Sequence, residues 1–557
     1  MTTVTSWGSS DGGARTRPGL RVRRTFLRAG VTVAVMLATT AWAGAGEPDA
    51  ATRQGPLSPT LAGDVLDVVL GEVDLIHGGF GHQGKQMPGT ILTLVARRHA
   101  ETGDPRLRDV LTRTLDAMAR GAIRDHLGGG FFRGTTDRAW RKPRFEQLDV
   151  IQAQVIVAYL LGYQATGSPR YRAVAEEVLA YADRVLARPG GGFSAGQGPD
   201  GDAGYFLWNE AEVRAALPAA EAELLVRHFG FAGVAERRAL AVDVAAGDLA
   251  AEAGVSLEIM ERRLRAAKDR LRQARVTRGE PAVDATVYAD RSALLASAYL
   301  EAYKVLGGEE RLRVALDTLE FLRARLRQPD GSMAHAFRDD RVTAAGSLDD
   351  QFAVASAFLD AFEVTGVARH LDSARALVTH AVARFRAADG GFFDAIAPRK
   401  PFVDEDRPGG NALAALVLDR LYDLTNVAAY RTLARDTLAA RPGAAQPLGP
   451  RAATYAYAAD VHVNGALHVV IAGKAADPRT RMLWRGALRA FRPGKIVAAY
   501  DPDVIDVAAV PAPVAAMLRQ TAGAEPRGYV CSGTVCSLPQ ADAERLRELV
   551  ERLGRKP

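Results

Sequence analysis

The chain has 557 residues, of which 48% are hydrophobic and 24% charged, with 54 glycines, 27 prolines and two cysteines. This composition excludes an intrinsically disordered chain, a collagen-like repeat and a small disulfide-stapled protein. The formal net charge is +6, but residues 1–45 hold six arginines and one aspartate, so the rest of the chain is close to neutral. Nucleic-acid-binding proteins concentrate positive charge on the folded domain, so we expect no nucleic-acid partner.

Residues 1–45 carry the pattern of an export signal. A basic stretch precedes an apolar run over residues 29–43, which is shorter than the roughly 20 residues of a membrane-spanning helix. Ala41-Trp42-Ala43 is typical of a cleavage site, and Arg23-Arg24-Thr25-Phe26-Leu27 is typical of the twin-arginine signal that exports folded proteins. The sequence predicts a periplasmic or extracellular protein that meets the membrane only through this segment. The alternative is a segment that stays uncleaved as an anchor.

A short turn recurs between segments with helical apolar spacing. It contains Thr-Gly or a similar pair, and the next segment opens with proline or an acid, as expected where glycine ends one helix and another begins. The interval between turns is nearly constant, except for one doubled interval that holds an insertion around residues 195–285. A Gly-Gly-Phe motif interleaves with these turns. A period of this length accommodates two helices and two loops. The turns begin at Thr102, Thr166, Leu306, Thr365 and Thr425.

The apolar residues of these segments predict how the helices pack. Residues 169–187 have apolar side chains every three or four positions, as in an amphipathic helix. Residues 348–364 and 410–424 are apolar on more than one side. A helix with two apolar faces needs neighbours on both, which suits the inner layer of a double-layered ring. The sequence therefore predicts a mainly α fold in which six helical hairpins form an (α/α)6 toroid over residues 55–460.

The stretch from Gly128 to Glu146 is the densest mixture of glycine, aromatic and charged residues in the chain. Glycine-rich turns let the backbone approach a ligand, aromatic rings stack on the C–H faces of sugars, and charged side chains hold hydroxyl groups in fixed geometry. Loops at one end of a toroid converge on a central funnel, where a pocket is expected. We predict a sugar-binding funnel to which this stretch contributes Arg133, Asp137, Trp140, Arg144, Phe145 and Glu146.

Further acidic residues follow in the second half of the predicted toroid. Asp349-Asp350 opens one helix, and the acidic loop 404–406 precedes Asn411. Two carboxyl groups that converge across a funnel are the minimum for acid–base chemistry on a glycosidic bond or a sugar carbon. We predict Glu146 and Asp350 as catalytic residues and Asp349 and Asn411 as substrate-binding residues. The structural alternative is that the two aspartates only favour a helix N-terminus and that the loop is only solvated.

The chain offers no pattern that would hold a cofactor or a metal. Residues 79–84 match G-x-G-x-x-G, but they lie among helical segments and not in the βαβ unit that a dinucleotide requires. The histidines form neither H-E-x-x-H nor a cluster with cysteine. We therefore expect no cofactor and no metal ion.

After residue 460 the pattern changes to short β-prone runs at 467–472, 495–500 and 529–531, which alternate with helical segments at 477–491 and 540–553. This alternation predicts a small α/β module over residues 461–557. Cys531 and Cys536 flank a four-residue loop and can lie opposite each other in a hairpin. In an oxidising compartment a disulfide is favoured over two free thiols.

Four segments together resemble the thioredoxin-domain-containing family that includes the spermatogenesis-associated proteins. They are residues 128–146, 348–352, 410–411 and 529–539, and the resemblance covers roughly residues 70–540. It implies a thioredoxin-like domain joined to a six-hairpin toroid similar to those of glycosidases and N-acylglucosamine epimerases. The activity of the family is itself poorly defined, so the resemblance implies a fold more than a reaction.

The chain departs from that family's pattern in several places. Only about a dozen residues separate Ala43 from the first predicted helix, so we expect the N-terminal thioredoxin-like domain to be missing. No Cys-x-x-Cys is present, so we expect no thiol-oxidoreductase activity. Phe132 and Arg144 stand where the family has histidines, and Ile151 stands where it has an aspartate. These losses leave open whether this chain is catalytic.

These features predict an exported toroid protein that binds or processes a sugar or glycan, as a hydrolase or an epimerase if it is catalytic. The alternative is a non-catalytic scaffold that binds a protein partner in the cell envelope. A shared concave pocket around Trp140, Glu146 and Asp350 would favour the first interpretation. Burial of these residues in contacts between helices would favour the second.

Overall fold

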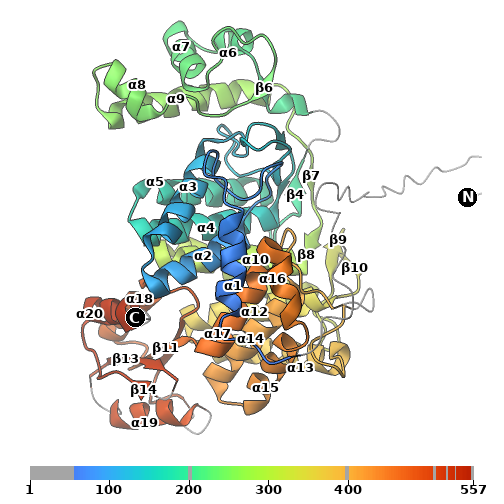
Figure 1. Cartoon of the computed structure of the whole chain (residues 1–557), viewed down its shortest axis with the longest axis vertical. Coiled ribbons are helices and arrows are strands. Elements are labelled where there is room, and N and C mark those ends of the chain that lie inside the picture. The colour runs from blue at the N-terminus through green and yellow to red at the C-terminus, as the bar shows by residue number, and fades with distance from the viewer. Residues whose placement is uncertain are drawn as a thin grey trace, which may run out of the picture. The chain divides into compact units, whose positions relative to one another are not determined.

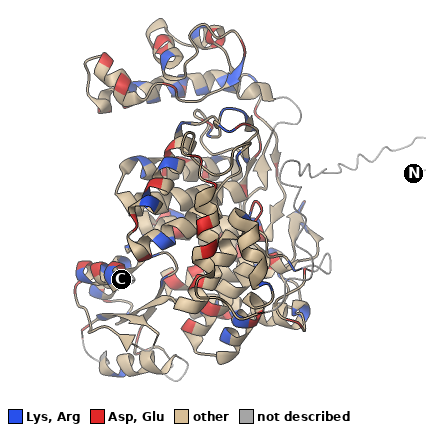
Figure 2. Ribbon diagram, in the orientation of Figure 1, with Lys and Arg blue, Asp and Glu red and all other residues tan. Residues whose placement is uncertain are grey.

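The computed structural model describes residues 55–198, 203–394, 400–505, 510–521, 525–533 and 535–553. The predicted signal segment lies outside these residues. The described chain comprises a ring of helices, an insertion and a small α/β module (Figure 1). Basic and acidic residues are interspersed over the ring and on its outer helices (Figure 2). Among the described helices, none combines the length and the apolar character needed to cross a membrane.

Six helices form a closed inner ring. Each packs against the next one along the chain, and the last packs against the first. The structure thus confirms the predicted mainly α fold and the (α/α)6 toroid. The inner helices are α2 (Gly89–Thr102), α4 (Asp149–Thr166), α10 (Ala289–Leu306), α12 (Leu348–Thr365), α14 (Gly410–Thr425) and α17 (Ala453–Asn464).

An outer layer of helices covers the ring, one against each inner helix. The outer helix follows its inner partner directly in five of these pairs, and in the sixth α1 packs against α17. The outer helices are α1 (Leu61–Gly71), α3 (Pro105–Arg120), α5 (Pro169–Tyr181), α11 (Glu309–Arg325), α13 (Ala368–Phe385) and α15 (Ala428–Leu438). Residues 348–364 and 410–424, predicted for the inner layer, form α12 and α14. The helix α16 (Ala445–Leu448) lies on the connection from α15 to α17.

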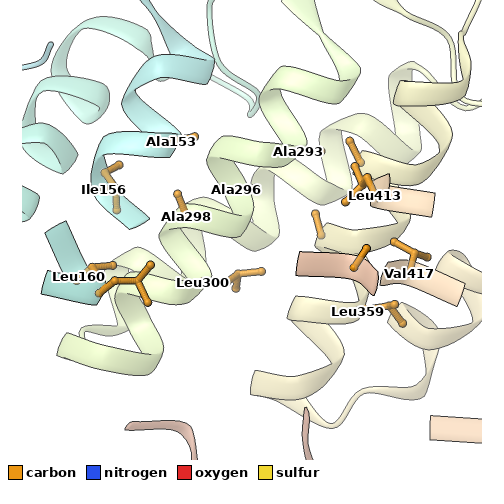
Figure 3. Close-up of a cluster of buried hydrophobic side chains, with 14 of the residues drawn as sticks. Ala153, Ile156, Leu160, Ala293, Ala296, Ala298, Leu300, Leu359, Leu413 and Val417 are labelled. Atoms are coloured by element: carbon orange, nitrogen blue, oxygen red, sulfur yellow. The ribbon is translucent and has the colours of Figure 1, made fainter. Parts of the chain in front are cut away.

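Small and branched apolar side chains fill the space between neighbouring inner helices. Figure 3 shows Ala153 and Ile156 of α4 near Ala296 and Ala298 of α10, and all four are buried. Alanine lets the helix backbones approach closely, and the longer side chains fill the remaining volume. The inner helices are consequently apolar around most of their circumference, which explains their two apolar faces in the sequence.

The recurrent turns end the inner helices in the predicted way. Gly103, Gly167 and Gly366 close α2, α4 and α12 with φ between +65° and +72°, and Asn426 closes α14 with φ +56°. This left-handed conformation costs glycine nothing and asparagine little, whereas other residues resist it. After two of these turns the outer helix starts at a proline, in α3 and in α5.

The interleaved Gly-Gly-Phe motif forms a tight turn in the loop that precedes an inner helix. We call this turn, together with the hydrogen bonds that hold it, a clasp. In each clasp the aromatic residue or its methionine equivalent forms a backbone bridge to a residue before the glycines, as Phe131 does with Arg124 and Met333 with Arg327. At Phe131, Phe193, Met333 and Phe392, a polar side chain at the start of the following inner helix then accepts a hydrogen bond from the backbone N–H of that residue. Gln152 and Gln351 each bond both the N–H and the C=O group of that residue. The sequence repeat therefore serves the ring's architecture.

The insertion between the second and third hairpins has its own hydrophobic core. Leu225, Phe231, Leu264 and Leu271 are among its buried members. Its helices are α6 (Glu210–Ala216), α7 (Ala219–His228), α8 (Ala246–Glu252) and α9 (Leu257–Val276), with strands β5 (Leu207–Trp208) and β6 (Arg238–Ala239). It accounts for the doubled interval of the sequence repeat.

Short strands join the loops that precede the inner helices. β1 (Gly134–Thr135) pairs with β2 (Pro143–Arg144), and β4 (Gly196–Gln197) lies between β3 (Gln147–Leu148) and β7 (Val283–Asp284). β9 (Ala336–Arg338) lies between β8 (Val287–Tyr288) and β10 (Arg341–Ala344). These strands tie successive loops together at the end of the ring where the inner helices begin.

The C-terminal module is a three-layer α/β unit. Its sheet has the order β12-β11-β13-β14, in which β11 is parallel to β12 and antiparallel to β13. Helices α18 and α20 pack together against β11 and β13, and α19 also contacts β11. This β-α-β-α-β-β-α order with its third strand antiparallel to the others is the topology of the thioredoxin fold. The elements are β11 (Leu467–Ala472), α18 (Pro478–Arg489), β12 (Ile496–Tyr500), α19 (Ala512–Thr521), β13 (Arg527–Ser532), β14 (Val535–Cys536) and α20 (Ala543–Leu553).

The cysteines of this module lie in its hairpin and not at a helix start. Cys531 on β13 and Cys536 on β14 face each other in the ladder and form a disulfide. A redox-active thioredoxin motif places Cys-x-x-Cys beside a βαβ unit. Here residues 473–477, which lead into α18, contain no cysteine. The topology is thus present without the usual redox motif.

Candidate functional site

Four aspartates gather where the inner helices begin, and all but Asp349 are fully buried. Asp149 is the first residue of α4, Asp290 the second of α10, and Asp349 and Asp350 the second and third of α12. We call these four residues the acidic cluster. A carboxylate in the first turn of a helix is favoured by the helix dipole, which explains why the chain can place acids there. The helix dipoles alone do not require that four aspartates lie together at one end of the ring.

Arg407 links two members of the acidic cluster. Its guanidinium lies 2.9 Å from Asp349 and 3.3 Å from Asp290. Neither carboxylate oxygen of Asp290 has a hydrogen-bond partner among the described residues, and one oxygen of Asp349 also lacks one. Burial raises the pKa of Asp349 to about 6, although Arg407 opposes the shift. The side chain of Asp349 is 13% exposed, although its oxygen without a partner is itself buried.

His335 and Asp350 form a hydrogen-bonded dyad. His335 Nδ1 lies 3.0 Å from one oxygen of Asp350, and the other oxygen accepts from the backbone N–H and the hydroxyl of Ser347. The bond to Asp350 raises the pKa of His335. Nε2 of His335 has no hydrogen-bond partner among the described residues, and the side chain is 27% exposed. A carboxylate that orients an imidazole in this way is a common arrangement for a general acid or base.

Asp149 is fully buried beside Arg291. The guanidinium Nε donates to Asp149 over 2.6 Å, while the second carboxylate oxygen lacks a partner among the described residues. Burial raises the pKa of Asp149 to about 7, with Asp290 adding to the shift and Arg291 opposing it. Asp149 therefore titrates near neutral pH.

We expect the substitution Asp149→Asn to change how stability depends on pH. The pKa of Asp149 is higher in the folded chain than the value near 3.9 of an unfolded aspartate, so the wild type loses stability relative to the variant as pH rises towards 7. Between pH 5 and pH 8 the difference in the free energy of unfolding should move by about 2–3 kcal/mol in favour of the variant. Urea unfolding at both pH values measures it, with Glu146→Gln as the control amide. A constant difference would contradict the buried ionisation.

The predicted residues Arg133 and Glu146 lie together at the same end of the ring. Arg133 contacts Asp406 over 2.6 Å and Glu146 over 3.4 Å. The neighbour of Asp406 in the chain is Arg407, which reaches the acidic cluster. Arg133 and Glu146 are therefore linked to the acidic cluster indirectly, because Arg133 pairs with Asp406 and the next residue, Arg407, pairs with Asp349. The Glu146 side chain is 51% exposed, so it borders the cluster without being buried in it.

Trp140 and Asp137 have structural contacts. Trp140 is 1% exposed and its indole N–H donates to the carbonyl of His77 over 3.1 Å. Its ring fills the space beside Gly79, where a Cβ atom would come within 2.6 Å of it. The carboxylate of Asp137 accepts from the backbone of its own loop, at Arg141 and Lys142. The structure therefore does not expose the Trp140 ring as a stacking surface, and burial is the reason.

Phe145 and Arg144 precede α4 on the same loop. Phe145 stacks on Phe206 of the insertion with ring centroids 5.3 Å apart and meets Phe132 edge to face. Arg144 ends β2 and is partly exposed. Phe132, which replaces a histidine of the family pattern, is thus part of an aromatic contact that holds the insertion against the ring.

Asn411 is a clasp residue of α14. It is fully buried, its carbonyl accepts from Phe392 N–H over 2.7 Å, and its amide donates to the carbonyls of Phe392 and Pro401. All these bonds go to the backbone, in the arrangement that Gln351 makes on α12. The side chain of Asn411 therefore has a structural role, and its bonds to the backbone would have to break before it could bind a substrate.

We expect Asn411→Ala to destabilise the toroid by about 2–5 kcal/mol, because it leaves the buried backbone N–H and C=O groups of Phe392 without the partner that Asn411 provides. Thermal and urea unfolding measure this effect. Thr425→Ala removes two hydrogen bonds of a partly exposed hydroxyl at the end of the same helix and serves as the control, with a much smaller expected loss. An Asn411→Ala protein as stable as the wild type would show that the clasp is dispensable.

Among the described residues, one group could hold a metal ion. Asp290, His335 and Asp350 each offer a ligand atom, and these atoms lie within 4.8 Å of one another. His335 Nδ1 and Asp350 already bond each other, so a metal would have to displace that bond or use Nε2. No pattern in the sequence predicted this group.

Sequence reasoning missed Asp149, Asp290, His335 and Arg407. A signal was present for the aspartates, because both follow an extended residue that leads into an inner helix, as Asp349-Asp350 does. His335 precedes β9 and Arg407 lies in a loop, and neither position carries a local pattern. Only closure of the ring places them beside the aspartates.

Comparison with known proteins supports the resemblance drawn from the sequence. No family model matches the chain. Spermatogenesis-associated protein 20 of Homo sapiens is 26% identical over 582 residues, covering 92% of this chain and 72% of that protein. The protein of the same name from Mus musculus is 25% identical with the same coverage. An uncharacterized protein of Caenorhabditis elegans is 22% identical and covers 85% of this chain and 71% of its own length.

Solved structures with a similar course of the chain include three proteins of carbohydrate metabolism. A GH76 α-mannanase of Bacteroides thetaiotaomicron is 12% identical with a TM-score of 0.44, covering 71% of this chain and 95% of its own. A cellobiose 2-epimerase of Bacillus thermoamylovorans is 9% identical with a TM-score of 0.45, covering 68% and 85%. An unsaturated glucuronyl hydrolase specific for heparin is 11% identical with a TM-score of 0.45, covering 73% and 96%. The ring of this chain is established independently by its own helix contacts.

Proposed function

We propose that this protein is a sugar-processing enzyme that performs acid–base chemistry at the acidic cluster. The observation that carries the proposal is the His335–Asp350 dyad, which lies beside Asp349, a partly exposed aspartate with one carboxylate oxygen that has no partner among the described residues. A proton acceptor and a proton donor with pKa values near neutral are the requirement for breaking a glycosidic bond or inverting a sugar carbon. The fold contributes to the proposal only by gathering the loops at one end of the ring, where a binding site can form.

The exposure of each residue indicates its role in the proposed proton transfer. His335 and Asp349 are the partly exposed groups that would exchange protons with a substrate, whereas Asp350 positions His335. Arg407 fixes Asp349 and would hold a hydroxyl or carboxylate of the substrate through its remaining N–H groups. Glu146 and Arg133 border the same loop and would contact the more distant part of a sugar. Hydrolysis and epimerisation share these needs, and the product distinguishes them.

The experiment is a ligand screen followed by product analysis. The chain from Gly44 onward is mixed with monosaccharides, disaccharides, uronic acids and amino sugars at millimolar concentration, and thermal stability is recorded. A ligand at a hundred times its Kd stabilises by about 2.7 kcal/mol. Ligands that stabilise the wild type but not Asp349→Asn are then incubated and analysed for released sugars or epimers. Stabilisation without any product would support sugar binding alone.

A flat response from a folded protein would instead favour the scaffold alternative, in which the chain binds an envelope partner. Two observations favour the scaffold alternative: Trp140 is buried, and the side chain of Asn411 is occupied by bonds to the backbone. Capture of partners from an envelope fraction, compared between the wild type and a variant that keeps the same fold, would then identify the binding surface.

We also propose that the protein is exported. The twin-arginine pattern and the apolar run support this, and the Cys531–Cys536 disulfide fits an oxidising compartment. Replacing Arg23 and Arg24 together by lysine should retain the precursor inside the cell. Fractionation measures this, and unchanged export of the double variant would contradict the twin-arginine route.

A further inference from the structure

A cavity lies at the opposite end of the ring from the acidic cluster. It has a volume of about 210 Å³, and its walls come from the carboxyl-terminal halves of α4, α10 and α12, from α14 and α17, and from residues 488–497 of the C-terminal module. We call it the carboxyl-end cavity. Asp290 and Lys304 lie at the two ends of α10, 14 positions apart, which corresponds to about 21 Å along the helix. The cavity is therefore separate from the site of the proposed function.

Most charged groups in the carboxyl-end cavity neutralise one another. Lys304 lies 3.0 Å from Glu363 and 3.4 Å from Glu301, and Arg420 lies 2.8 Å from Asp360 and 2.9 Å from Glu363. These ion pairs join three inner helices near their carboxyl ends, where cations are favoured by the helix dipoles. Lys304 and Arg420 are therefore already paired with carboxylates of the ring and are not available to an acidic ligand. Asp423 also lines the cavity, and burial raises its pKa to about 7.

Two cations contributed by the C-terminal module are different. Lys495 Nζ donates to the carbonyl of Ala490 over 2.9 Å and has no carboxylate within 4.0 Å among the described residues. Arg492 is nine-tenths buried. Its Nη2 lies 3.5 Å from Glu101, while its Nη1 has no hydrogen-bond partner among the described residues. An ammonium group carries three N–H donors, so both side chains retain donors that the protein does not satisfy. Buried donors without partners are costly.

The cavity has room for a ligand and a way in. Its volume exceeds the roughly 150 Å³ of an engineered protein cavity that holds benzene. The side chain of Glu301, which lines it, is 28% exposed, so the cavity reaches solvent on that side. Burial and the neighbouring Lys304 lower the pKa of Lys495 to about 8, which still leaves the ammonium form in the majority at neutral pH.

We propose that the carboxyl-end cavity binds a small organic acid of about the size of a sugar, whose acidic group accepts hydrogen bonds from Lys495 and Arg492. The acidic group is a carboxylate or a phosphate, since both satisfy several N–H donors at once. Hydroxyl groups of the same ligand would meet the polar wall formed by Tyr457 and Gln164. Because the module supplies both cations, ligand binding also fastens the module to the ring.

The test is isothermal titration of the full folded chain with three probes of similar size. Glucuronate tests the carboxylate, glucose 6-phosphate tests the phosphate, and glucose is the neutral control. At least one acidic probe should bind, and glucose should bind at least tenfold more weakly. Lys495→Gln should weaken that binding at least tenfold, whereas Lys495→Arg, which keeps the charge, should retain most of it. Lys474→Gln changes an exposed lysine of the same module and should have no effect.

Several outcomes would overturn the proposal. They are failure of both acidic probes to bind, equal binding of glucose, and unchanged affinity in Lys495→Gln. Binding of the acidic probe should also survive His335→Gln, which alters the acidic cluster at the other end of the ring. Loss of binding in His335→Gln would assign the probe to the site of the proposed function instead.

Discussion

Replacing His335 by glutamine is expected to lower the turnover of a sugar substrate by about 10²- to 10⁴-fold, the usual contribution of a general acid or base. Glutamine keeps a polar side chain that can still bond Asp350, but it cannot exchange a proton. The side chain is partly exposed, and Asp350 is its only hydrogen-bond partner among the described residues, so the fold should persist. Steady-state kinetics should show the loss in kcat, with the melting temperature close to that of the wild type.

Two variants separate this role from a structural one. Asp350→Asn should lower kcat and shift the pH profile, because it changes the partner that raises the pKa of His335. Glu146→Gln removes a half-exposed carboxyl group at the border and should act mainly on KM if Glu146 only contacts the distant part of the substrate. Equal turnover in the wild type and His335→Gln would show that the dyad does not transfer the proton. Glu146 would then be the leading candidate for the general acid or base.

The helical ring was predictable because its signals are local. A helix that ends at Gly103 or Gly167, a proline that starts the next one and apolar residues on two faces are each read within a single helix and its turn. The regular recurrence of these turns then gives the number of hairpins. Likewise, alternation of strands and helices after residue 460 was sufficient for an α/β module. Its thioredoxin topology was not predictable, because strand order depends on the pairing of β11 with β13, which lie far apart in the sequence.

The candidate site was predictable only in part, because its contacts span the ring. Asp350 was predicted from its position at the start of a helix. His335 was not, because its candidate role depends on a hydrogen bond to Asp350 that only the folded hairpin between them creates. Arg407 reaches Asp290 over 117 positions of sequence. Trp140 illustrates the opposite error. An aromatic residue among glycines suggests a stacking surface, yet Gly79 leaves the space into which its ring packs.

Closure of the ring depends on Arg97, and we expect Arg97→Met to destabilise the protein by about 3–5 kcal/mol, the usual cost of breaking a buried ion pair from one side. Arg97 on α2 bonds Asp460 of α17 over 2.6 Å, lies 2.9 Å from Glu101, and donates to the carbonyl of Pro493 over 3.0 Å. Its side chain is 2% exposed. It therefore joins the first inner helix to the last and both to the C-terminal module.

The exposed pair between Arg106 and Asp104 provides a matched control. It has a similar distance of 2.7 Å, but the Arg106 side chain is 83% exposed, so Arg106→Met should cost less than about 1 kcal/mol. Urea unfolding of both variants measures the difference. The double variant Arg97→Met, Asp460→Leu should recover part of the loss, because it removes one of the two carboxylates that lose Arg97. If Arg97→Met were no more destabilising than Arg106→Met, apolar packing of α2 against α17 would suffice to close the ring.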